Sequence, residues 1–309
     1  MIRLIPIFCV LQACSIVLVD EPCDTGSGPL QGETGAPPEA LHFQAVGTGA
    51  THSCGILDSG ELLCWGLGDE GQLAVPSGRH QQLTVGHAHA CSLDEAGDAH
   101  CWGRDEDGQT QLSGVFIQVT AGGAHSCGLD EEGQIVCVGS NDWGQLDAPL
   151  GRYQQVAAGA THTCAVTEPE DGKAAAAVCW GSLQTESMGR GEALSVISGT
   201  DWACGAFSDG AGTVSCVGES SDGQHTIPDD LDNASAVAGA RHGCGLTASG
   251  AAVCWGADDA AQSEAPDDLF HALGSGPTSL HTCGIVDDGA SGVGPVLCWG
   301  LDAENQLTP

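Results

Sequence analysis

The segment THSCGILDSGELLCWG, residues 51–66, decides the fold because variants of it occur seven times along the 309-residue chain. Each copy has two cysteines, a turn between them and an apolar stretch on either side of the turn. Self-similarity at a regular period, here 36–40 residues, indicates a repeat architecture in which each copy is one supersecondary unit. The first cysteines of the copies are Cys54, Cys91, Cys127, Cys164, Cys204, Cys244 and Cys283.

An apolar, alternating stretch precedes the cysteine pair, such as FIQVTAG at residues 116–122 or YQQVAAG at residues 153–159. The alternation predicts a first strand, and the two cysteines then fall on a second and a third strand. The seventh copy has Thr278 five residues before its first cysteine, after the sequence GSGP, where the other six copies have a glycine. These glycines are Gly49, Gly86, Gly122, Gly159, Gly199 and Gly239.

The turn between the two cysteines predicts that they form a disulfide. In four copies the cysteines are ten residues apart and a glycine lies six residues after the first, as Gly60 follows Cys54. A hairpin with a three-residue loop needs a left-handed glycine at its last loop position, which places Cys54 directly opposite Cys64. Opposed strand residues lie within the Cα range of a disulfide. The expected pairs are Cys54–Cys64, Cys91–Cys101, Cys127–Cys137, Cys164–Cys179, Cys204–Cys216, Cys244–Cys254 and Cys283–Cys298.

Composition favours an exported protein and disfavours nucleic acid as a partner. Zinc sites and thioredoxin-like redox sites typically use Cys-x-x-Cys, which the chain lacks, so its 17 cysteines indicate disulfides and an oxidising compartment. The net charge is −34, from 41 acidic and 7 basic residues. Nucleic-acid binding depends on neutralising phosphates with Lys and Arg, so such a role is excluded as a main function.

The first 40 residues predict an export signal and a spacer. Residues 1–13 have a positive start and an apolar run, and LQAC at residues 11–14 is similar to the lipobox of bacterial lipoproteins, in which Cys14 would be acylated. The alternative is an ordinary signal peptide whose apolar part continues to Val19. Residues 14–40 are acidic and rich in Gly, Pro and Thr, which predicts a disordered linker before the repeats at residues 41–309. Cys23 has no assigned role.

These features predict an all-β fold, a seven-bladed β-propeller with three to four short strands and one disulfide in each blade. Each unit has too few strands to bury both faces, and closing the units into a ring removes the exposed ends. The alternative architecture is an open β-solenoid.

The order of motifs in each copy resembles the regulator of chromosome condensation repeat. Residues 118–137 (QVTAG, then AHSCGL, Gly133 and IVC) are followed by SNDWGQL, and in that family Gly-x-x-His-Ser/Thr is followed by a Trp-Gly motif and by Gly-Gln-Leu-Gly. The blade length is similar to that of short-repeat bacterial members such as the propeller-type β-lactamase inhibitor protein. The cysteine pair is a departure from the family pattern. The resemblance implies the propeller fold, but the founding member's nuclear exchange activity does not suit an exported, acidic chain. The recurring glutamines are Gln72, Gln109, Gln145, Gln224, Gln262 and Gln306, with Ser187 in the fourth copy.

Two recurring side chains are interpreted as structural. A histidine lies two residues before the first cysteine, so it shares a strand face with the disulfide, where we expect it to be hydrogen-bonded to the backbone. A tryptophan after the second cysteine points to the opposite face, where we expect it to pack against the next blade. Trp143 and Trp202 lie off this register and are better candidates for surface contact. The histidines are His52, His89, His125, His162, His242 and His281, and the tryptophans are Trp65, Trp102, Trp180, Trp255 and Trp299.

The function expected from the sequence is non-catalytic protein recognition by a monomer at the cell surface or in the periplasm, anchored to the outer membrane only through the lipid. Acidic loops would supply the contacts, which favours a basic protein partner. The alternatives are a carbohydrate or cell-wall lectin and an inhibitor of a secreted enzyme. No cofactor is expected, and Asp105 and Asp107 in the sequence DEDG form only a weak calcium candidate.

Overall fold

The structure is a computed structural model that describes residues 41–309 except 171, 186, 209–212, 232–234 and 290–291. Residues 40–309 form one compact unit. The described residues contain no helix, and therefore none that is long and apolar enough to cross a membrane. They form 21 strands in seven antiparallel three-stranded sheets.

Each sheet consists of three consecutive strands, so each repeat is one blade. The blades, in chain order, are β1 (Phe43–Thr48), β2 (His52–Leu57) and β3 (Leu62–Gly66); β4 (His80–Val85), β5 (His89–Asp94) and β6 (Ala99–Gly103); β7 (Gln118–Ala121), β8 (His125–Leu129) and β9 (Ile135–Gly139); β10 (Tyr153–Ala158), β11 (His162–Thr167) and β12 (Ala177–Gly181); β13 (Glu192–Ser198), β14 (Trp202–Ser208) and β15 (Val214–Gly218); β16 (Val237–Ala238), β17 (His242–Leu246) and β18 (Ala252–Gly256); and β19 (Phe270–Gly274), β20 (His281–Val286) and β21 (Val296–Gly300).

The hairpin between the second and third strands has the expected geometry. In blade 1 the amide of Leu57 donates to the carbonyl of Glu61 at 2.8 Å, and Gly60 has a φ of +87°. This register places Cys54 opposite Cys64 with their Cα atoms 4.0 Å apart. One disulfide in each blade is therefore confirmed. The bonds join Cys54–Cys64, Cys91–Cys101, Cys127–Cys137, Cys164–Cys179, Cys204–Cys216, Cys244–Cys254 and Cys283–Cys298.

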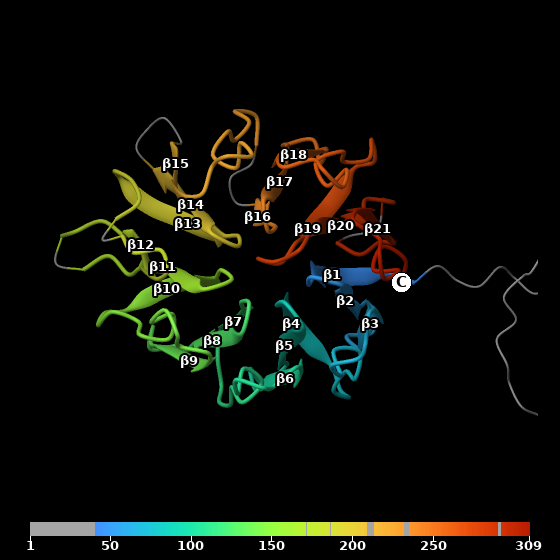
Figure 1. Ribbon diagram of the computed structural model, residues 1–309, viewed down its shortest axis with the longest axis horizontal. Helices are drawn as coiled ribbons and strands as arrows, with labels where there is room; N and C mark the ends of the chain where they lie inside the picture. The colour runs from blue at the N-terminus through green and yellow to red at the C-terminus, as the bar shows by residue number, and fades with distance from the viewer. Residues whose placement is uncertain (1–40, 171, 186, 209–212, 232–234, 290–291) are drawn as a thin grey trace, which may run out of the picture. The chain divides into compact units, whose positions relative to one another are not determined.

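The seven blades form a closed ring, with the first strand of each blade toward the centre (Figure 1). Blade 7 lies beside blade 1, where the amides of Phe43 and Gly294 each donate to the other's carbonyl, at 2.8 and 3.1 Å. The hydroxyl of Thr48 also donates to the carbonyl of His281 at 3.2 Å. The closed ring confirms the propeller with three strands in each blade and excludes the open solenoid.

The inner strands are joined across the blades by glutamine side chains. The amide group of Gln118 donates to the carbonyl of Val156 at 3.0 Å, and its oxygen accepts from the amide of Val156 at 2.9 Å. Gln155 makes the same pair of bonds to Val196 in the next blade. Since backbone groups at the edge of a sheet need partners when they are buried, these side chains satisfy edges that the short blades leave open.

The ring has two faces, which are named here by the turns that they carry. The hairpin face carries the turns between second and third strands, such as residues 58–60, and the ends of the chain segments that enter the first strands. The loop face carries the turns between first and second strands, such as residues 49–51, and the connections that leave the third strands, such as residues 67–74.

Candidate functional site: the blade junctions and the acidic loop face

A fully buried histidine lies at six of the seven junctions between blades. It is the first residue of the middle strand, and in four junctions its Nε2 lies 2.8–2.9 Å from a hydroxyl oxygen of the following blade. That hydroxyl belongs to the residue that follows the equivalent histidine. The pairs are His89–Ser126, His125–Thr163, His242–Thr282 and His281–Ser53.

The hydroxyl has a second partner that defines the histidine tautomer. The Ser126 hydroxyl donates to the carbonyl of Gln109 at 2.8 Å, and Gln109 belongs to the same blade as His89. Because a hydroxyl has only one proton to donate, it accepts at Nε2, so the imidazole carries its proton there. Ser126 is thus held by two groups of the preceding blade. Thr163 and Ser53 donate in the same way, to the carbonyls of Gln145 and Gln306.

A glycine lies three residues before every junction histidine except His281, and the position of the histidine ring explains it. A Cβ placed on Gly122 would lie 2.4 Å from Cε1 of His125 and 2.5 Å from the carbonyl oxygen of Gly159. No side chain fits at either distance, because the ring of the histidine lies directly on the glycine. The glycine therefore allows the imidazole to lie flat in the junction.

The histidines are uncharged at neutral pH. Burial lowers the pKa of His52, His125 and His281 to about 3 and that of His89, His162 and His242 to about 4. The described residues contain no group of three or more His, Cys, Asp or Glu side chains that could hold a metal ion. The histidines therefore fill the junctions as neutral rings, and four of them are hydrogen-bonded to the following blade.

The prediction that these histidines bond to the backbone is wrong for the four paired rings, because Nε2 of each ring is bonded to a side-chain hydroxyl. The imidazole rings of His52 and His162 have no hydrogen-bond partner among the described residues. At their junctions the following blade has Ala90 or Ala203 in place of the serine or threonine. Sequence analysis missed the hydroxyl residues, although the His-Ser/Thr pair in the motif was the signal for them.

The recurring tryptophans pack against a neighbouring blade, but it is the preceding one and not the next. Trp102 of blade 2 packs in one cluster with Cys54 and Ile56 of blade 1, and its Nε1 donates to the carbonyl of Gln72 at 2.9 Å. The reason is that the residue after the second cysteine faces opposite to the histidine, which points forward. Trp65, Trp180 and Trp255 donate in the same way to the carbonyls of Gln306, Gln145 and Gln224, and Trp299 packs with Cys244 and Leu246 of blade 6.

The two tryptophans outside this register differ from each other. Trp202 takes the place of the histidine in blade 5, is 0% exposed and donates from Nε1 to the carbonyl of Ala240 at 3.0 Å. Its predicted surface role is therefore wrong, since the large ring fills the junction. Trp143 is 60% exposed on the loop face, and its amide donates to Oε1 of Gln145.

The connections on the loop face share one rigid turn. Oε1 of the buried Gln72 accepts a hydrogen bond from the amide of Glu70 at 2.8 Å, and Gly71 between them has a φ of +82°. At the equivalent position Ala261 and Asn305 adopt the same left-handed conformation, with φ of 59° and 57°. Gln109, Gln145, Gln224, Gln262 and Gln306 make the same contact in their own turns.

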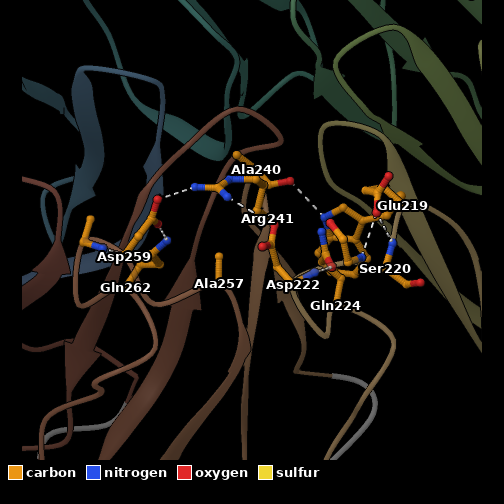
Figure 2. A network of polar contacts seen from close by, with 12 residues as sticks. Glu219, Ser220, Asp222, Gln224, Ala240, Arg241, Ala257, Asp259 and Gln262 are labelled. Carbon is orange, nitrogen blue, oxygen red and sulfur yellow. Dashed lines mark hydrogen bonds and ion pairs between the residues drawn. The ribbon is translucent and has the colours of Figure 1, made fainter.

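The carboxylates expected in these turns are on the loop face, and one arginine joins two of their turns (Figure 2). Arg241 donates to Asp222 of the blade 5 connection at 3.2 Å and to Asp259 of the blade 6 connection at 2.5 Å. Hydrogen bonds from Gln262 and Arg241 lower the pKa of Asp259, and the pKa of Arg241 is raised by the Asp259 carboxylate. The exposed carboxylates of this face include Asp69, Glu70, Asp105, Glu106, Asp107, Asp142, Asp201, Glu219, Asp258, Asp259, Asp302 and Glu304.

The weak calcium candidate has another role in the turn. Asp105 accepts from the amide of Thr110 at 3.0 Å and from Nε2 of Gln111 at 3.3 Å, and the Thr110 bonds lower its pKa. Asp258 and Asp302 likewise accept an amide five residues later. Asp107 is exposed, and only its amide is hydrogen-bonded, to Gln109. The Asp105 carboxylate is therefore used to hold its own turn, and Asp107 takes part in the turn only through its amide.

Comparison with known proteins finds a similar family of repeats and propellers of similar fold. The family model for the regulator of chromosome condensation (RCC1) repeat matches residues 43–72 and 116–145. The ectodomain of the Physcomitrella patens receptor kinase CR4 is similar with a TM-score of 0.68 at 21% identity, covering 84% of this chain and 73% of that chain. For the CRINKLY WD40 ectodomain of the Arabidopsis thaliana receptor kinase ACR4 the values are 0.66 and 23%, with 87% and 98% covered. For Prp20p from Saccharomyces cerevisiae they are 0.61 and 14%, with 84% and 82% covered.

Proposed function

We propose that the chain, a seven-bladed propeller whose residues 43–72 and 116–145 match the regulator of chromosome condensation repeat, is an exported, non-catalytic scaffold that recognises a protein partner. The repeat motif and the propeller fold support a protein-binding scaffold, and the recurring histidines and tryptophans of the blade junctions have structural roles. Its buried histidines are neutral and enclosed, so they are not available as general bases to a substrate.

The disulfides support export. Seven bonds, one in each blade, are typical of proteins that fold in an oxidising compartment. The expected signal at residues 1–13, the acylated Cys14 and the linker at residues 14–40 lie outside the described residues. They complete the proposal of a monomeric lipoprotein held at the outer membrane, facing the periplasm or the cell surface.

The loop face is the proposed contact surface, and a single observation carries this choice: its carboxylates are exposed on turns that are rigidly held. The buried glutamines fix the turns from within, as Gln72 holds Glu70 and Gln109 holds Asp107. The two arginines of this face, Arg104 and Arg241, are already paired with the local carboxylates Glu106, Asp222 and Asp259. The surface is therefore preorganised and negative, which favours a basic partner.

The test is crosslinking on intact cells, followed by mass spectrometry, with two matched triple variants. Glu70→Gln, Asp107→Asn and Asp142→Asn remove three exposed charges from the loop face. Glu61→Gln, Glu95→Gln and Glu131→Gln remove three from the hairpin face. We expect the wild type and the hairpin-face variant to capture the same basic protein and the loop-face variant to lose it. Equal capture by both variants would contradict the proposed surface.

A carbohydrate lectin is the second function, and the exposed ring of Trp143 on the loop face favours it. A glycan array distinguishes the two proposals, because a lectin would bind defined glycans and lose them in Trp143→Ala. An array without binding, together with a captured protein, would remove the lectin function.

A further inference from the structure

A pocket lies beside the outer strand of blade 4. Its volume is about 670 Å³, and its walls come from residues 149–153, from residues 167–170 and 173–176 between β11 and β12, from β12 itself, and from Gln184 and Thr185 after it. The insertion in this repeat, with its cysteines 15 residues apart, supplies one wall. Pockets of about 300–1,000 Å³ are typical of sites that enclose most of a drug-sized molecule.

The space exists because small side chains line one wall. Residues alternate along this segment, so that Ala174, Ala176 and Val178 line the pocket while Ala175 and Ala177 are buried in the core of the blade. Three lining positions therefore carry small aliphatic groups. A larger residue at Ala174 or Ala176 would fill the pocket without entering the packed core.

Two aromatic residues that are largely buried also belong to the pocket lining. Tyr153 and Trp180 have ring centroids 6.1 Å apart. Their polar atoms are satisfied elsewhere, since the Tyr153 hydroxyl donates to the carbonyl of Pro149 at 2.6 Å and Trp180 Nε1 donates to that of Gln145 at 2.9 Å. Burial raises the pKa of Tyr153, so both rings are uncharged at neutral pH.

The charges of the pocket lining cancel, unlike those of the chain as a whole. Arg152 Nε lies 2.7 Å from Glu168 Oε2, and Glu170 and Lys173 add one charge of each sign. Leu150 also belongs to the pocket lining, and its side chain is fully exposed. An ion of either sign would therefore gain no net charge complementarity in the pocket, whereas an apolar group would remove both its own surface and that of the walls from water.

We propose that this pocket binds a small, uncharged hydrophobic molecule. The volume and the apolar walls fit such a molecule, and the cancelled charges disfavour a charged one. The lining of the pocket contains none of the carboxylates proposed above to contact a protein partner.

The experiment is a titration of the oxidised protein with Nile red, an uncharged hydrophobic dye, followed by fluorescence. We expect saturable binding at one site that is unchanged in 1 M NaCl, because no charge is involved. Ala174→Phe and Ala176→Phe should each weaken the binding of the dye at least tenfold. Ala303→Phe adds the same ring at an exposed position of the loop face and should leave the binding unchanged. Thermal unfolding checks that each variant is folded.

A variant at the exposed Leu150 keeps the test decisive if the filled pockets disturb folding. Leu150→Ser removes apolar lining without touching the core, and we expect it to weaken the dye severalfold. Absence of saturable binding to the wild type would overturn the proposal. So would binding that all three pocket variants leave unchanged, or a pocket that takes up only the side chains of a peptide and no dye.

Discussion

Nε2 of His281 in the last blade lies 2.8 Å from the hydroxyl of Ser53 in the first, although the two residues are 228 positions apart. The same contact joins His89 to Ser126, which is only 37 residues away. Ring closure therefore uses the ordinary junction contact, and the chain needs no special element to connect its ends.

Removing the closing hydroxyl should destabilise the protein measurably. Ser53→Ala leaves His281 Nε2 and one acceptor site of the Gln306 carbonyl without the hydroxyl, and a buried polar group that loses its partner costs about 1–3 kcal/mol. Ser53→Thr should retain stability, because threonine occupies the equivalent position in blades 4 and 7. Urea unfolding measures the change, with the exposed Ser77→Ala as the control. Equal stability of Ser53→Ala and the control would contradict the role of the hydroxyl.

The junction between blades 1 and 2 can be improved by supplying the hydroxyl that it lacks. Ala90→Ser places an oxygen between His52 and the carbonyl of Gln72, which already accepts from Trp102 as Gln306 does from Trp65. A net hydrogen bond contributes about 0.5–1.5 kcal/mol, so we expect a stabilisation of about 1 kcal/mol. Ala96→Ser in an exposed turn adds the same group without a buried partner and serves as the control in thermal unfolding. A loss of stability at Ala90→Ser would mean that the junction has no room for the oxygen.

Mild acid should destabilise the propeller through its histidines. The folded pKa values of about 3 to 4 lie below the unfolded value of about 6.5, so the unfolded chain binds more protons below pH 6.5. The free energy of unfolding is then highest above that pH and falls as the pH drops toward 4. Each histidine contributes up to about 1.4 kcal/mol per pH unit in this window. Urea unfolding at pH 7, 6 and 5 should show a loss of at least about 3 kcal/mol.

A variant identifies the groups responsible for this pH dependence. His162→Gln should reduce the proton uptake on unfolding by about one between pH 6.5 and 5. The variant and the wild type share every other ionisable group, so the difference between their slopes reports the contribution of His162. A slope that is the same in the variant and the wild type would show that other groups cause it.

The disulfides predict a low thiol count and a large effect of their removal. Thiol titration of the denatured, unreduced protein should find at most the three cysteines outside the repeats, Cys9, Cys14 and Cys23. Replacing Cys127 and Cys137 by alanine should cost about 2–3 kcal/mol, the value that loop entropy gives for so short a loop. Urea unfolding measures the loss, and fourteen reactive thiols would contradict the disulfides altogether.

One turn of the loop face should be stabilised by glycine. Ala261 has a φ of 59°, where the equivalent residues of other blades are glycines, such as Gly71 and Gly108. A left-handed conformation costs a residue with a Cβ about 1–2 kcal/mol, which exceeds the entropy that glycine adds to the unfolded chain. Ala261→Gly should therefore raise the melting temperature slightly, whereas Ala260→Gly, one residue earlier, should lower it. The reverse order would contradict the strain at Ala261.

The seven blades and the disulfide of each could be predicted because they depend on contacts within one repeat, whereas the number of strands in a blade was predicted only as three to four. Gly60 fixes the register of its own hairpin, and Cys54 finds its partner ten residues away. The glycine before each histidine was visible as a pattern, but its cause was not. The cause involves both the ring of the histidine and the carbonyl of the next blade's glycine.

The parts that could not be predicted lie between repeats. Sequence periodicity shows that His89 and Trp102 point to opposite faces, but it does not show which neighbouring blade each face meets. That depends on the direction in which the ring closes. The burial of Trp202 follows from the same cause, since its position is equivalent to a histidine of the junction. The pocket of blade 4 arises from an insertion, whose shape the other copies do not define.

Every disulfide that the structure describes lies within a blade, and none crosses a junction. Oxidation therefore stabilises each blade and leaves the closure between blade 7 and blade 1 to noncovalent contacts alone. In such an assembly of nearest neighbours, the first step of unfolding is separation between two intact blades. The ring can therefore open between two blades in an oxidising environment and close again while every disulfide and the main chain stay intact.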